Sequence, residues 1–172
     1  MYQRKFLRAK LVVGRRASWY ESKLKDLVVR LGLESYVQFI PWVPMEKVFT
    51  YMSITDIGLI PHNSNPHTET TVPHKLFQYM LFGKPVIVSS CRPLKRIVEE
   101  TGAGLVFHTG DPWDLARKIS ILHRSGKLRS EMGMQGRKAV TIGKYSWDRS
   151  AEALKNAYRA ASKKVWKHLP RF

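Results

Sequence analysis

Residues 70–89 have the sequence TTVPHKLFQYMLFGKPVIVS, which predicts a loop, a helix, a glycine stop and a buried strand in succession. Pro73 suits the first turn of the helix and Gly83 suits its end. Three residues give the helix an apolar face: Leu76, Phe77 and Met80. A helix that starts beside the end of a strand presents free backbone N–H groups, which suit phosphate. The stretch therefore indicates a nucleotide-binding site in an α/β fold.

Short apolar runs alternate with amphipathic stretches along almost the whole chain, without a Ser/Gly-rich linker or an internal repeat. This alternation is typical of a parallel sheet covered by helices. We expect strands near residues 9–14, 36–40, 55–61, 85–89 and 105–107, and helices near residues 18–32, 45–53, 73–83, 93–100, 111–124 and 128–142. The sequence predicts one domain over residues 1–172, with a Rossmann-like core over residues 10–142 and a long helix over residues 146–168.

The helix expected over residues 146–168 has one apolar stripe on a strongly basic surface. The stripe recurs at spacings of three and four residues and comprises Trp147, Ala151, Leu154, Tyr158, Ala161 and Val165. A basic amphipathic helix of this kind can lie on a membrane surface. Its stripe can equally pack on the domain as ordinary core, and the sequence leaves both interpretations open.

The formal net charge of +17, from 30 Lys and Arg against 13 Asp and Glu, is concentrated at the two ends of the chain. Residues 1–30 carry a net charge of +7 and residues 115–172 carry +12, whereas residues 31–114 carry −2. A nucleic-acid interface along the central motif is therefore not expected. The basic flanks fit three interpretations: attraction to anionic lipid, attraction to RNA, or a solvated surface without a partner.

The chain has a single cysteine, Cys91, which excludes an internal disulfide and fits a reducing cytosol. We expect Cys91 to be a small buried apolar residue rather than a reactive thiol. No apolar run approaches about 18 residues, and residues 1–6 lack the hydrophobic segment of a signal peptide. The expected location is cytoplasmic, with peripheral attachment to the inner face of the membrane as an option.

Seven short motifs follow one another in a fixed order: LVVG at 11–14, VQF at 37–39, DIGL at 56–59, PHKLF at 73–77, GKPVIVS at 83–89, GAGLV at 102–106 and YSW at 145–147. Their order and spacing resemble the C-terminal, donor-binding half of GT-B fold glycosyltransferases, specifically family 4 ("group 1") and its relatives. The resemblance implies a retaining enzyme that transfers a sugar from a nucleotide diphosphate sugar to a polysaccharide or lipid-linked acceptor. It implies no metal and no other cofactor.

The same resemblance implies a donor site lined by loops at the strand ends. The turn at residues 40–43 would meet the nucleobase, and backbone N–H groups before and at the start of the helix at Pro73 would meet the pyrophosphate. Lys75 would add positive charge there, although a solvated lysine on a helix is the commoner case. The residues placed at the donor in this way are Trp42, Val43, Thr70, Thr71, Val72, Pro73, Lys75 and Gln78.

The chain departs from the family pattern at a pair of glutamates separated by seven residues. The second glutamate, which accepts hydrogen bonds from the ribose hydroxyls, is replaced by Gln78, and Thr70 stands at the first position. Gln78 can still accept a hydrogen bond through its amide oxygen, but without the charge-assisted strength of a carboxylate. Glu69, one place out of register, is a candidate catalytic residue or a solvated loop charge. Weaker donor binding is therefore expected.

The resemblance also implies missing parts. In the family, one more strand and helix precede the element matching residues 11–14, and that segment carries basic residues that neutralise the diphosphate. Residues 1–9 are too short to replace it. The N-terminal acceptor domain is missing as well. We therefore expect this chain to be part of a larger glycosyltransferase and to be inactive alone, because transfer needs two substrates held in one cleft.

Other interpretations remain beside the transferase. His62, His67 and His74 lie within 13 residues, but no Cys or Asp stands at supporting spacing, so contact of a loop histidine with the donor is favoured over a metal site. A noncatalytic basic module for RNA or an anionic membrane is the main alternative. A sugar-nucleotide epimerase of the same fold is disfavoured, because the motifs at 73–77 and 145–147 resemble transferases.

Overall fold

The structure is a computed structural model that describes residues 11–14 and 19–166. The chain forms two compact units, Met1–Thr50 and Tyr51–Phe172, and each is described by itself. The expectation of a single domain stays a prediction. The expected start of a helix at residue 18 and the expected end of the C-terminal helix at residues 167 and 168 lie outside the described residues.

The first unit contains a parallel pair of strands and a helix. β1 (Leu11–Gly14) pairs with β2 (Val37–Ile40) in parallel, with Leu11 beside Val37. α1 (Trp19–Arg30) connects the two strands, and the turn after it contains Gly32 with a φ of +62°, a conformation that favours glycine. α2 (Met45–Ile54) begins in this unit and ends in the second.

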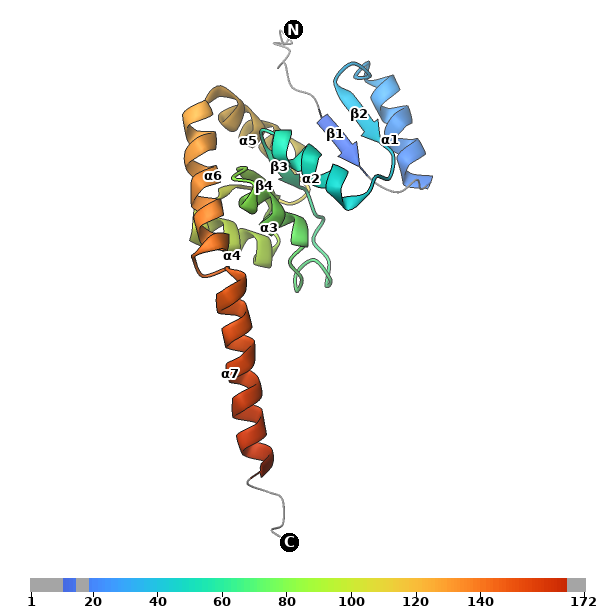
Figure 1. The fold of residues 1–172 in the computed structure, drawn as a ribbon. Helices are drawn as coiled ribbons and strands as arrows, with labels where there is room; N and C mark the ends of the chain where they lie inside the picture. The colour runs from blue at the N-terminus through green and yellow to red at the C-terminus, as the bar shows by residue number, and fades with distance from the viewer. Residues whose placement is uncertain (1–10, 15–18, 167–172) are drawn as a thin grey trace. The chain divides into compact units, whose positions relative to one another are not determined.

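The second unit is built on three parallel strands (Figure 1). Their order is β3 (Gly58–Ile60), β4 (Val86–Ser89) and β5 (Gly104–Phe107). All four residues of β4 are buried, because β4 has a strand on each side and helices on both faces. The helices that follow the strands are α3 (His74–Leu81), α4 (Arg92–Thr101), α5 (Pro112–Arg124) and α6 (Gly126–Thr141).

Apolar side chains from alternate positions of β4 enter two different cores. Val86 and Val88 pack with residues of α3 and α4, including Leu76, Met80 and Leu94. Ile87 packs on the other face with Phe107 and Leu122 of α5. This alternation follows from the pleat of a strand, whose successive side chains point to opposite faces. The expected α/β class, with a parallel sheet and helices on both faces, is confirmed, and so is the burial of Cys91.

The end of α3 lies against α6 through a pair of glycines. Gly83 has a φ of +65° and ends α3 as expected. A Cβ added at Gly133 of α6 would lie 2.0 Å from the carbonyl oxygen of Gly83. Only a residue without a side chain therefore allows the two backbones to approach this closely, a contact that helical periodicity did not predict.

α7 (Trp147–Trp166) is the long C-terminal helix (Figure 1). Its apolar stripe is exposed: Trp147, Leu154 and Tyr158 have exposed fractions of 81%, 60% and 71%. The interpretation of this stripe as ordinary core of the described unit is therefore wrong for these three side chains. Within residues 11–14 and 19–166, no helix is long and apolar enough to cross a membrane.

Candidate functional site

The carboxyl ends of β3, β4 and β5 meet at one edge of the sheet, because the three strands are parallel. The segments that follow them are residues 61–73, 90–91 and 108–111, and these lead into α3, α4 and α5. Ligands of open parallel α/β sheets bind outside this edge. The candidate site of the second unit is therefore built from these three segments and the three helix starts.

The three helix starts differ in how their free N–H groups are satisfied. The carboxylate of Asp111 accepts the N–H groups of Trp113 and Asp114 at 2.9 and 3.0 Å and so caps α5. The carboxylate of Glu69 accepts the N–H of Arg92, the first residue of α4, at 3.0 Å. These two helix starts are thus occupied by carboxylates of the chain itself.

The start of α3 has no such cap. Pro73 precedes the helix without a side-chain hydrogen bond to it. The backbone N–H groups of His74 and Lys75 have no acceptor among the described residues. Free N–H groups and the positive end of the helix dipole together attract an anion. Of the three helix starts at this edge, α3 is the one open to a ligand.

Lys75 places a cation at this same helix start. Its side chain is half-buried, and burial holds the pKa of its ammonium group below the usual value of 10.5. No carboxylate within the described ranges pairs with it. A positive charge near a helix N-terminus is itself unfavourable. A bound anion would offset both the burial of this charge and its unfavourable place at the helix start, so the position of Lys75 suits an anionic ligand.

Thr70 and Thr71 form a tight turn before α3. Their N–H groups donate to the carbonyl of His67 at 3.2 and 3.1 Å, and their hydroxyls also donate to backbone carbonyls of this loop. The expected pyrophosphate contacts through these two N–H groups would require those hydrogen bonds to break. Val72 follows the turn, and its N–H has no acceptor among the described residues. The free donors are therefore those of Val72, His74 and Lys75.

The loop before this turn is held by its own side chains. Asn65 Oδ1 accepts the N–H groups of His67 and Thr68 at 3.0 Å each. The Thr68 hydroxyl donates to the carbonyl of Asn63 at 2.7 Å. These bonds are typical of an Asx turn, which the Asn-Pro pair at 65 and 66 could have indicated. The loop thus fixes the chain that leads to Val72 and α3.

Glu69 is engaged through both carboxylate oxygens. The Ser64 hydroxyl donates to Oε1 at 2.7 Å, and the N–H of Arg92 donates to Oε2 at 3.0 Å. The hydrogen bond from Ser64, followed by that from Arg92, holds the pKa of Glu69 below its usual value of 4.5. In this arrangement Glu69 joins the loop to α4. Its expected role as a catalytic residue stays a prediction, and the geometry gives it a structural one.

Gln78 lies one turn after Lys75 on α3, and residues three apart share a helix face. Its side chain is half-buried and makes no hydrogen bond with the described residues, so its amide group is available to a ligand. Leu76 and Met80, on the opposite side of α3, are fully buried. Lys75 and Gln78 therefore share the face of α3 that the core does not use.

Trp42 and Val43 belong to the first unit, in the segment between β2 and α2. Trp42 is 64% exposed and Val43 is half-buried. Their expected contact with a nucleobase stays a prediction.

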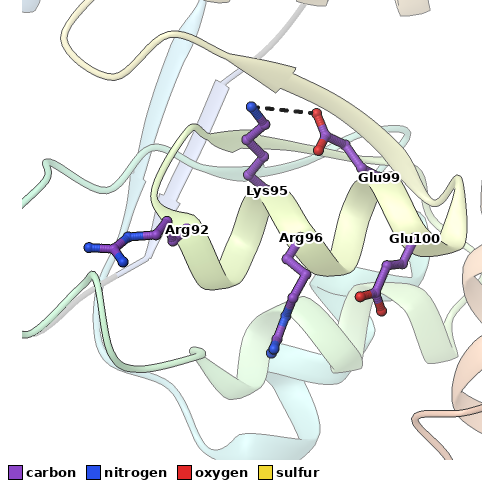
Figure 2. Close-up of a pocket in the computed structure, with 5 residues that line it drawn as sticks. All are labelled: Arg92, Lys95, Arg96, Glu99 and Glu100. Atoms are coloured by element: carbon purple, nitrogen blue, oxygen red, sulfur yellow. Dashed lines mark ion pairs between the residues drawn. The ribbon is translucent and has the colours of Figure 1, made fainter.

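A hollow lies along the exposed side of α4 (Figure 2), and Arg92 at its start is also the residue bound by Glu69 of the loop. It is lined by exposed charged side chains of one helix: Arg92, Lys95, Arg96, Glu99 and Glu100. Lys95 and Glu99 form an ion pair at 3.9 Å, and Glu100 accepts hydrogen bonds from Lys144 and Tyr145. The hollow therefore mixes acidic and basic side chains on the outer face of one helix, whereas the start of α3 combines a half-buried lysine with free N–H groups.

The histidines do not gather into a metal site in the described part of the chain, where no three His, Cys, Asp or Glu side chains lie together. His62 is half-buried near Lys75 and His67, and burial followed by the charge of Lys75 lowers its pKa. The cluster at the start of α3 is therefore basic, with a chemistry suited to an anion rather than a cation.

Comparison with known proteins gives this basic site its context. The model of the family described as glycosyl transferases group 1 matches residues 7–139, which include all three strand-end segments of the site. The chain belongs to this family. The membership confirms the resemblance found in the sequence motifs.

Individual group 1 and related glycosyltransferases match the chain at low identity. A D-inositol 3-phosphate glycosyltransferase of Geodermatophilus obscurus is 24% identical over 143 residues, covering 83% of this chain and 30% of that protein. Sucrose-phosphate synthase of Thermosynechococcus elongatus has a TM-score of 0.78 at 20% identity, covering 90% of this chain and 39% of that one. HepE of Anabaena, solved with UDP-glucose, has a TM-score of 0.69 at 21% identity, covering 86% of this chain and 41% of that one.

These likenesses show that the fold is that of the group 1 glycosyltransferases. The chain spans 30% of the length of the D-inositol 3-phosphate glycosyltransferase that it matches. It spans about two fifths of the two solved chains. The activity of the longer proteins is therefore a matter for proposal.

Proposed function

We propose that the chain binds the diphosphate of a nucleotide sugar at the start of α3. The observation that carries this proposal is the half-buried Lys75, which lacks an acidic partner among the described residues and stands beside free N–H groups. A diphosphate supplies the missing negative charge. The family and the UDP-glucose complex of HepE favour a nucleotide sugar as its source.

Each residue at the start of α3 then has a role in holding the donor. The N–H groups of Val72, His74 and Lys75 donate to phosphate oxygens, and the Lys75 ammonium neutralises their charge. Gln78 accepts a hydrogen bond from a ribose hydroxyl through its amide oxygen. We expect donor binding to require no metal, as the family resemblance implies.

We propose further that this donor-binding part serves a retaining glycosyltransferase that acts on a polysaccharide or lipid-linked acceptor at the inner face of a membrane. Family membership supports the transferase class, while retention and the acceptor rest on the resemblance alone. Alone, the chain is expected not to transfer sugar, because one site holds one of two substrates. Its main competitor is a noncatalytic binding module of the same fold.

The donor proposal is tested by thermal unfolding with a panel of nucleotide sugars, namely UDP-glucose, ADP-glucose and GDP-mannose. A ligand that binds only the folded state raises the melting temperature with its concentration. We expect one member of the panel to do so, and its parent nucleoside without phosphate to have no effect. If no member raises the melting temperature at millimolar concentration, the chain is not a donor-binding domain.

The exposed stripe of α7 favours a second proposal, peripheral attachment to an anionic membrane. Trp147, Leu154 and Tyr158 are exposed on a helix that also carries exposed Lys155 and Arg159. Vesicles with anionic lipid should bind the chain, and the double variant Leu154→Ser, Tyr158→Ser should bind them less. If the double variant binds the anionic vesicles equally well, the apolar stripe of α7 is not the membrane attachment site. A protein partner would then be the remaining candidate to cover the stripe.

A further inference from the structure

His62 is held in place at the carboxyl edge of the sheet by its own backbone. It follows β3 by two residues, and its N–H donates to the carbonyl of Ile60 at 3.1 Å. Its carbonyl accepts the thiol of Cys91, the residue before α4, at 3.8 Å. Cys91 is fully buried, so this contact fixes His62 between β3 and the start of α4. Its position is set by the core rather than by the exposed loop that follows.

The side chain of His62 lies in a basic environment. It is half-buried, and burial is the main cause that holds its pKa below the usual value of 6.5. Lys75 on α3 and His67 in the same loop add positive charge and lower the pKa further. Cys91 contributes a neutral thiol, and the nearby Glu69 is engaged with Ser64 and Arg92. Within the described residues, no carboxylate stabilises the charged form of His62.

We propose that His62 takes up a proton when the donor diphosphate binds beside Lys75 and then holds the diphosphate as a second cation. This inference rests on the proposed function, because the diphosphate is its ligand. In the free protein, burial and the positive charge of Lys75 hold the pKa of the imidazole below 6.5, which disfavours its charged form. A bound diphosphate reverses the electrostatic part of this environment, since its two negative charges outweigh the single positive charge of Lys75.

The coupling between donor binding and protonation of His62 has a defined sign. The pKa of His62 is below 6.5 in the free protein, and the bound diphosphate raises it. Donor affinity is therefore highest below the free pKa and falls as the pH rises through the bound pKa. Between the two values the affinity changes by at most about tenfold per pH unit, the limit for one coupled proton. A nucleotide sugar has no titrating phosphate in this range, because each phosphorus carries one strongly acidic oxygen.

The test is a calorimetric titration of the full chain with the nucleotide sugar found by the panel, at pH values from about 5 to about 8.5. We expect the affinity to fall with rising pH and binding to take up a proton, measured from the heats in two buffers of different ionisation enthalpy. His62→Gln should flatten the pH profile and abolish the uptake. His123→Gln, an exposed histidine on α5, is the matched control and should keep both.

The outcomes separate the two proposals. A pH-independent affinity, or a pH profile that survives in His62→Gln, overturns the role of His62 while leaving the donor site intact. Absence of binding at every pH overturns the donor site itself. If His62→Gln fails to fold, the imidazole resonance of His62 is titrated by NMR in the unaltered chain, with and without donor. An unchanged pKa overturns the proposal.

Discussion

The carboxylate of Glu69 accepts the backbone N–H of Arg92 at 3.0 Å, joining residues that lie 23 positions apart. This bond ties the loop before α3 to the first residue of α4, and Ser64 holds the other carboxylate oxygen. A side chain used in this way caps a helix and stabilises the fold. The hydrogen bond between Glu69 and Arg92 therefore gives Glu69 a primarily structural role.

Glu69→Ala should lower the melting temperature, because the first N–H of α4 loses its acceptor and the loop loses its attachment. Glu131→Ala, at an exposed position of α6, is the control and should leave the melting temperature nearly unchanged. The lowered pKa of Glu69 also predicts how its effect on folding stability changes with pH. The stabilisation by the Glu69 carboxylate is fully present above about pH 4.5, the usual pKa, and is lost as the pH falls through the lower pKa of the folded protein. The gap in stability between the two alanine variants should therefore narrow in acid.

Much of this fold was predictable from the sequence, because the deciding signals are local. Pro73 and Gly83 mark the two ends of α3, and the helix expected near residues 111–124 is α5. The link from Glu69 to Arg92 was not predictable, since it depends on how two loops meet in space. The family resemblance also implied phosphate contacts at Thr70, Thr71 and Val72, but the N–H groups of Thr70 and Thr71 donate within the turn itself. Local sequence patterns do not reveal which backbone N–H groups of a loop donate hydrogen bonds within the loop itself.

Lys75→Gln should weaken donor binding by about tenfold or more, the usual worth of a hydrogen bond to a charged group. The same change should leave the free protein equally or more stable, because it removes a half-buried cation that has no acidic partner among the described residues. Calorimetry and thermal unfolding measure the two effects. Lys138→Gln, on the exposed face of α6, makes the same charge change away from the site and should leave donor binding unaltered.

Gln78→Glu should strengthen donor binding several-fold at neutral pH. A carboxylate accepts a ribose hydroxyl with about twice the strength of a neutral amide. Lys75, three residues earlier on the same face, would also stabilise the new charge. A conjugate that lacks the ribose hydroxyls should lose this gain. Equal strengthening with such a conjugate would show that Gln78 does not contact the ribose.

Gly133→Ala should destabilise the second unit by about 1–3 kcal/mol, the usual cost of overpacking. The added Cβ would lie 2.0 Å from the carbonyl oxygen of Gly83, so α6 must move away from the end of α3. Gly126→Ala is the control, because its Cβ would lie no closer than 3.7 Å to Arg129 Nη2. Denaturant unfolding measures both variants, and the free energy of unfolding of Gly126→Ala should be unchanged or slightly higher.

The central claim, a diphosphate site at the start of α3, is tested most directly by amide NMR of the full chain titrated with UDP-glucose or the preferred nucleotide sugar. We predict that the largest shifts fall on the N–H groups of Val72, His74 and Lys75, with the amides along residues 95–100 of α4 unaffected. The opposite pattern, with shifts along the α4 hollow and none at the start of α3, would contradict the claim.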